Sequence, residues 1–115
     1  IVNWKALRTG EMYLIRAEAR ALQTGKEADA LADLNALRAA RIKEYLDLSL
    51  TGQALLDAIA EERRRELFVE GHRWFDVKRT TKTITRTDVA LQSTVKTIAS
   101  TAREWNWPIP TSELD

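Results

Sequence analysis

Apolar residues recur at helical spacing through the first third of the chain. The pattern predicts a helix from Thr9 to about Leu22, with Thr9 as its N-cap and Gly25 in the turn that ends it. A second helix is predicted from about Glu27 to Lys43. The positions expected on the inner faces are Leu14, Ala17, Ala21 and Leu22 in the first helix, and Ala30, Leu31, Leu34, Leu37 and Arg41 in the second.

Two helices of similar length joined by a tight glycine turn form an antiparallel hairpin. Residues 9–43 resemble one tetratricopeptide repeat in length and in their alternation of small and large apolar residues. Alanines on the second helix allow another helix to approach closely: Ala28, Ala32, Ala36, Ala39 and Ala40. A hairpin of this type buries its faces only against neighbours, so this one is expected to have another element packed on it.

A third helix is predicted over residues 51–79, after an extended connector (44–50) in which leucines alternate with polar residues. Thr51 is its expected N-cap. The helix is expected to continue through Gly71, with this glycine on the buried face where another backbone approaches. Its predicted apolar stripe is Leu56, Ala60, Leu67, Phe68, Gly71, Trp74 and Phe75.

The segment 80–115 lacks a strong helical pattern. Its threonine-rich start favours a flexible or edge-like loop over a core strand, and a short helix is predicted after Asp88 on the spacing of Leu91, Val95, Ile98 and Ala102. Pro108 and Pro110 force an extended path near the end. The predicted fold class is therefore all-α: a tetratricopeptide-like hairpin, a long third helix and an irregular tail, forming a single helical domain over residues 1–115.

Charged residues border the apolar stripe of the third helix. Charges next to a core are costly unless they are paired, so a partly buried ionic network is predicted there. Its expected members are Glu62, Arg63, Glu66, Glu70 and Arg73, with Arg63 in reach of Glu66 and Glu70 in reach of Arg73. The alternative is that Glu66 and Glu70 form a general acid and base couple, but arginines are in reach of both and no nucleophile accompanies them.

Composition narrows the possible functions. The 115 residues are 44% hydrophobic and 30% charged, with a formal net charge of +1. Basic and acidic residues alternate along the helices, which argues against a nucleic-acid partner. The chain contains no cysteine and a single histidine, His72, which is interpreted as a structural residue, so no metal or cofactor site is predicted. No apolar run approaches the length of a membrane span.

Three stretches together resemble the SusD/RagB family of outer-membrane glycan-binding lipoproteins. The first is EERRRELFVEGHRWFDVKR from Glu61 to Arg79, and the second is the hairpin YLIRAEARALQTGKEADALADLNALRAAR from Tyr13. The third is the WPIP sequence from Trp107, followed by Glu113. Within the hairpin the resemblance rests on Arg16, Glu18, Ala19, Gly25, Ala28, Asn35 and Arg38.

This resemblance implies a binding protein without catalytic activity. Such a protein captures oligosaccharides and hands them to a SusC-like TonB-dependent transporter, and it is held on the outer membrane, facing outward, by a lipid anchor upstream of Ile1. The chain is then expected to be the C-terminal part of a longer precursor. Trp105 and Trp107 are candidate sugar-stacking residues, with packing on the helices as the favoured alternative. The rival function is a free-standing tetratricopeptide-like module that binds a protein or peptide.

Overall fold

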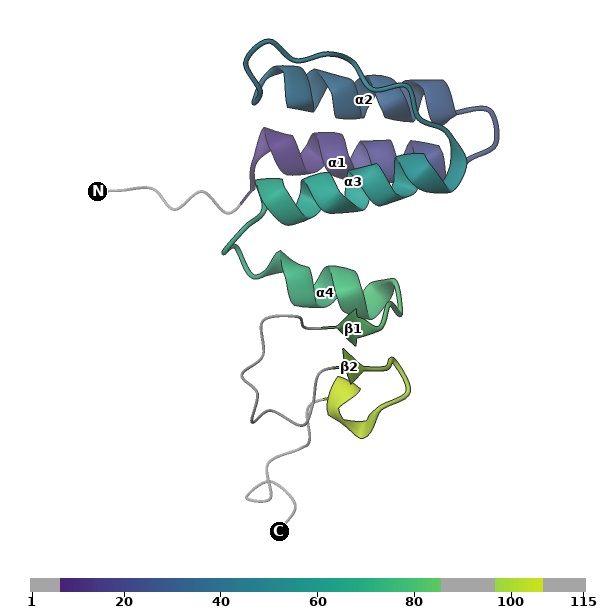
Figure 1. The fold of residues 1–115 in the computed structure, drawn as a ribbon, viewed down its shortest axis with the longest axis vertical. Coiled ribbons are helices and arrows are strands. Elements are labelled where there is room, and N and C mark those ends of the chain that lie inside the picture. The colour runs from purple at the N-terminus through teal and green to yellow at the C-terminus, as the bar shows by residue number, and fades with distance from the viewer. Residues whose placement is uncertain (1–6, 86–96, 107–115) are drawn as a thin grey trace, which may run out of the picture. The chain divides into compact units, whose positions relative to one another are not determined.

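The computed structural model describes residues 7–85 and 97–106 and is mostly helical (Figure 1). It contains helices α1 (Thr9–Ala21), α2 (Glu27–Ala39), α3 (Gly52–Glu66) and α4 (His72–Arg79), strands β1 (Ile84–Thr85) and β2 (Thr97–Ile98), and a 3-10 helix, η1 (Arg103–Trp105). These elements fall into two compact units, Ile1–Val69 and Glu70–Asp115. The predicted helical fold class is confirmed, with a small two-stranded sheet in addition.

Helices α1 and α2 form the predicted hairpin, and α3 packs mainly on α1 (Figure 1). Tyr13, Leu31 and Leu50 are among the partly buried side chains around the core. The buried cluster itself consists of Leu14, Ala17, Ala30, Leu34, Leu37, Leu55 and Ile59. The inner faces of α1 and α2 were therefore largely predicted, although Leu22 is 70% exposed because α1 ends one residue before it.

The long third helix was predicted as one piece, and this is wrong. Helix α3 ends at Glu66, a turn follows, and α4 begins at His72. Val69 has φ 65° and Gly71 has φ 80°, both left-handed values that a right-handed helix cannot contain. Gly71 serves this conformation and not a close approach, since nothing lies within 4 Å of where its Cβ would be.

Other helix boundaries also differ from the predictions. Helix α2 ends at Ala39 and not at Lys43. Thr51 holds the predicted N-cap position of α3, whereas Thr9 is the first helical residue of α1, and neither threonine makes a capping hydrogen bond through its side chain. In the connector, Leu48 and Leu50 pack against the core as expected, but Leu46 is 86% exposed.

The second unit contains α4, the two strands and η1. Ile84 pairs with Ile98 and Thr85 with Thr97 in antiparallel register, so a two-residue strand lies in the threonine-rich segment that was predicted to be a flexible or edge-like loop. The short helix predicted after Asp88 is wrong at Thr97–Ile98, where the chain is a strand, and its earlier part lies outside the described residues. The proline-containing end of the chain also lies outside them.

Candidate functional site: an ionic seam between three helices

The inner face of α3 changes from apolar to charged along its length. Leu55 and Ile59 are buried in its first half, and Glu62 and Arg63 are buried in its second half. With Glu66, these positions follow the i, i+4, i+7, i+8, i+11 spacing of one helix face. The predicted stripe through Leu56 and Ala60 was one residue out of phase, since both are only partly buried. Carboxylates therefore occupy the inner face of α3 where a continued apolar stripe was expected.

Glu66 joins three segments of the first unit. Its Oε1 lies 3.2 Å from Nη1 of Arg8, which precedes α1, and 2.9 Å from Nη2 of Arg41, which follows α2. Arg41 also donates from Nε to Oε2 at 3.0 Å, and Arg8 donates from Nη2 to the Glu66 carbonyl oxygen. The Glu66 side chain is only 7% exposed. The hydrogen bonds from Arg41, with the charges of Arg41 and Arg8, hold the pKa of this carboxyl below its usual range against the opposing effect of burial.

Gly10, in the first turn of α1, makes room for this carboxylate. A Cβ at Gly10 would overlap Oε1 of Glu66 and crowd its Cδ. The carboxylate therefore lies against the N-terminal turn of α1, where the helix dipole favours negative charge. A glycine near a helix start is thus explained by a side chain 56 positions away in the sequence.

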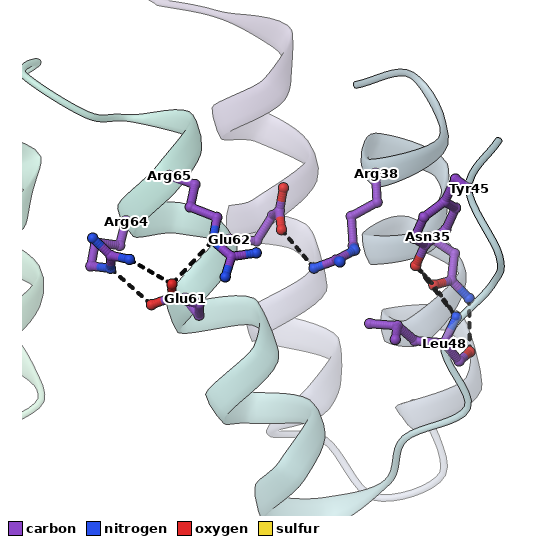
Figure 2. A network of polar contacts seen from close by, with 8 residues as sticks. All are labelled: Asn35, Arg38, Tyr45, Leu48, Glu61, Glu62, Arg64 and Arg65. Carbon is purple, nitrogen blue, oxygen red and sulfur yellow. Dashed lines mark hydrogen bonds and ion pairs between the residues drawn. The ribbon is translucent and has the colours of Figure 1, made fainter. Parts of the chain in front are cut away.

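Glu62 forms the second contact between α3 and the hairpin. Its Oε2 lies 2.9 Å from Nη1 of Arg38 on α2, and both side chains are largely buried (Figure 2). The guanidinium of Arg38 also lies over the ring of Tyr45, 5.3 Å from the ring centroid. We call the contacts of Glu62 and Glu66 with Arg8, Arg38 and Arg41 the ionic seam.

Asn35 fastens the connector to α2. Its Nδ2 donates to the carbonyl oxygen of Leu48 at 3.1 Å, and its Oδ1 accepts from the Leu48 amide at 3.1 Å (Figure 2). The hydroxyl of Tyr45 donates to the same Oδ1 at 2.7 Å. Tyr45 thereby links this backbone clamp to Arg38, so the clamp and the ionic seam form one continuous set of contacts.

A separate carboxylate ties α1 to α2. Asp33, 5% exposed, receives two hydrogen bonds from Arg16, at 2.9 Å from Nε and 2.7 Å from Nη2, and one from Arg20 at 2.7 Å. The paired geometry with Arg16 is the strong, oriented form of the arginine–carboxylate contact. It raises the pKa of Arg16 through these hydrogen bonds and the charge of Asp33.

The observed ionic contacts agree only in part with the network predicted along the third helix. Glu62, Arg63 and Glu66 are held at the inner face of α3, but the contacts of Glu62 and Glu66 run to other segments and not along the helix. Glu70 and Arg73 belong to the second unit and are exposed. Sequence reasoning missed Arg8, Arg38 and Arg41 as partners of these carboxylates, because a local pattern does not show contacts between distant segments.

The structure does not provide the arrangement that a general acid and base couple of Glu66 and Glu70 requires. Glu66 and Glu70 were expected one turn apart on a continuous helix, and α3 ends at Glu66. Glu66 also keeps its negative charge with two arginines, which unfits it for giving up a proton near neutral pH. The residues of the seam are thus arranged to hold helices together and not to move protons.

Of the two candidate tryptophans, the structure describes Trp105. It is 5% exposed, and its ring lies 5.7 Å from that of Trp74 on α4, with the ring planes inclined at 48°. This geometry supports the packing alternative for Trp105, since a sugar needs an open aromatic face. Trp107 lies outside the described residues.

The described residues were also examined for metal-binding groups and for membrane-spanning helices, and neither is present among them. In residues 7–85 and 97–106 no group of three or more His, Cys, Asp or Glu side chains could hold a metal ion. Within the same ranges, none of the helices combines the length and the apolar character needed to cross a bilayer.

The hairpin, the third helix and the ionic seam define a tetratricopeptide-like helical unit closed by buried arginine–carboxylate pairs. Residues 2–115 match the sequence model described as the SusD family. The chain belongs to this family. The resemblance on the Glu61–Arg79 stretch and on the hairpin is thereby confirmed.

One curated relative shows the extent of the match. The chain is 35% identical over 86 residues to the SusD-like protein P38 of Formosa agariphila. The matched region covers 67% of this chain and 17% of that protein. No solved structure matches the chain.

Proposed function

We propose that this chain is the C-terminal part of a longer SusD-family protein that captures oligosaccharides at the outer membrane. The complete protein then passes its ligand to a SusC-like TonB-dependent transporter and faces outward, held by a lipid anchor upstream of Ile1. It binds and does not catalyse. The described part serves as the rigid helical scaffold of the capture surface.

The match to the SusD family over residues 2–115 is the observation that carries this proposal. The 17% share of the relative's length supports placing the chain within a longer protein. The ionic seam, in which the Glu62 and Glu66 side chains are buried, supports a scaffolding role, because charge pairs that join three segments fix one geometry. The rival function, a free-standing module that binds peptides, explains the hairpin but not the family match.

A binding screen tests the proposal. The full-length protein, purified from its source gene, is titrated calorimetrically with oligosaccharides prepared from a panel of polysaccharides. The expected result is saturable binding of at least one glycan with no change in its chain length after incubation. Cleavage of the glycan would overturn the non-catalytic assignment, and absence of binding across the panel would overturn the assignment of ligand class.

A further inference from the structure

Exposed apolar side chains gather at one end of the first unit. Helix α1 begins at this end, and α2 and α3 both finish there (Figure 1). Glu66 draws the three segments together at this point, because it binds one arginine from each of the other two. Leu7, Ile42 and Phe68 are close in sequence to these contacts, and their exposed fractions are 74%, 40% and 72%. We call these three side chains the apolar end patch.

The apolar end patch has no polar side chain laid over it by the ionic seam. A single exposed apolar residue is ordinary in a folded protein, but large ones that gather on one surface mark a place of contact. Arg8 and Arg41 are the long side chains beside the patch, and their hydrogen bonds turn both toward Glu66. The patch is therefore a surface on which another apolar group can dock.

The segment that directly precedes the patch supplies such a group. Residues 1–6 read IVNWKA and lie outside the described residues. They combine three large apolar residues, Ile1, Val2 and Trp4, with a single charge. Tryptophan buries one of the largest apolar areas of any side chain. We propose that Trp4 packs on the apolar end patch, so that the segment 1–6 closes this end of the helical unit. The proposal does not depend on the function proposed above, since the segment belongs to this chain.

The length of the chain keeps Trp4 near the patch. Arg8 has an extended backbone, with φ −129° and ψ 143°, so the course of α1 does not continue before it. Three residues span at most about 11 Å, and Trp4 therefore stays within that distance of Leu7, which belongs to the patch. The far end of α1 is out of reach, because a helix of 13 residues is about 20 Å long.

This short tether also favours the segment over a separate partner. A group on the same chain meets the surface at a high effective concentration. A second copy of the chain or another protein must instead offset the translational and rotational freedom that association removes. Three apolar side chains form a small surface for that purpose, but they are enough to receive one tryptophan ring that is already close by.

Thiol labelling of the full-length protein tests this packing. Ile42→Cys and Phe68→Cys are introduced singly, each with Trp4 intact and with Trp4→Ala, and the rate of maleimide labelling of the native protein is measured. Leu22→Cys is the matched control, because Leu22 is 70% exposed and follows the far end of α1. We expect Trp4→Ala to raise the labelling rate of both patch cysteines at least about tenfold and to leave that of Leu22→Cys unchanged.

The other outcomes contradict the proposal. Patch cysteines that label equally fast with and without Trp4 would show that its ring does not cover them, whether the patch is open or covered by another part of the protein. Protection that disappears on dilution would assign the patch to a second copy. If circular dichroism shows that Trp4→Ala is unfolded, Trp4→Leu takes its place. This smaller apolar side chain should raise the patch labelling rates about threefold, and unchanged rates would overturn the proposal in the same way.

Discussion

At the scale of the residue, Glu66 carries most of the link between α3 and the ends of the other two helices. Its carboxylate meets Arg8 and Arg41 and lies against Gly10. The partners are half-exposed while Glu66 itself is not. When Glu66 is replaced, its arginine partners can therefore still be solvated and do not become unpaired buried charges. The change in the free energy of unfolding then reports the loss of the Glu66 contacts themselves.

Glu66→Gln is expected to lower the free energy of unfolding by about 1–2 kcal/mol. The side chain loses its charge opposite two arginines, and one of the two oxygens that accept from Arg41 becomes an amide donor, while the partly exposed arginines regain water. Urea denaturation measures the change. The matched control is Glu61→Gln, whose contacts with Arg64 and Arg65 lie on the solvent side of the same helix and whose loss should cost no more than about 0.5 kcal/mol. Equal effects of the two substitutions would contradict the special place of Glu66.

Acid should weaken the fold through the same carboxylates. The pKa of Glu66 is lowered in the folded state, chiefly by its hydrogen bonds from Arg41. Hydrogen bonds from Arg64 lower the pKa of Glu61 to about 2, but this side chain is 39% exposed, so solvent screening keeps its contribution to stability small. The unfolded chain, with carboxyls near 4.5, therefore takes up protons first as the pH falls. Stability should be constant near neutral pH and decline from about pH 4.5 toward pH 2, less steeply in Glu66→Gln. An identical decline in this variant would show that Glu66 does not contribute.

Gly10→Ala tests the close approach of Glu66 to α1. Alanine is the better helix former by about 1 kcal/mol, yet its methyl group would displace the Glu66 carboxylate from its arginines. We expect Gly10→Ala to destabilise the wild-type protein and to be neutral or stabilising in the Glu66→Ala background. A double-mutant cycle in urea gives the coupling, and additive effects would mean that the two residues do not interact.

At the scale of the element, two non-helical segments shape the fold: the connector, which is fastened to α2, and the turn that follows α3. Asn35 supplies the Leu48 backbone with the donor and the acceptor that a neighbouring strand would otherwise provide. Val69 and Gly71 supply the two left-handed residues that end one helix and begin the next.

Asn35→Ala is expected to cost about 1–3 kcal/mol, since the Leu48 amide and carbonyl lose their partner in a partly buried place. Hydrogen exchange should show faster exchange of the Leu48 amide, and urea denaturation gives the stability. Gln23→Ala is the control, because the Gln23 side chain contacts only the Ala19 carbonyl on an exposed surface. Unchanged exchange at Leu48 would count against the clamp.

The turn gives a pair of opposite predictions. Gly71→Ala should destabilise by about 1 kcal/mol, because φ 80° is strained for a residue with a Cβ even where space is free. Val69→Gly should be neutral or stabilising, since it relieves a β-branched residue at φ 65° that is 86% exposed. Thermal denaturation of both variants measures these changes. Stabilisation by Gly71→Ala together with destabilisation by Val69→Gly would instead indicate a continuous helix through this stretch.

The local spacing of apolar residues predicted some parts of the structure and not others. The periodicity of Leu14, Leu34 and Leu37 predicted the hairpin and its core, because burial of one helix face leaves a direct trace in the sequence. The same rule failed at Phe68 and Phe75, which are 72% and 69% exposed, because left-handed residues interrupt the helix that would have turned them inward. The partners of Glu66 are separated from it by 25 and 58 positions, and no local spacing predicts such contacts.

At the scale of the whole molecule, the described helices fit the proposal of one unit within a larger surface protein. The family match covers residues 2–115, while the chain spans 17% of the length of one relative in that family. In the proposed function, this unit works inside a longer, lipid-anchored protein of the outer membrane.

The most direct test is to fractionate source cells and identify, by mass spectrometry of intact protein, the chain that contains the peptide from Glu27 to Arg38. The proposed function predicts an outer-membrane chain several times longer than 115 residues, with an acylated cysteine at its N-terminus. A soluble chain of about this length, without a lipid, would contradict it and make the free-standing helical module the better description.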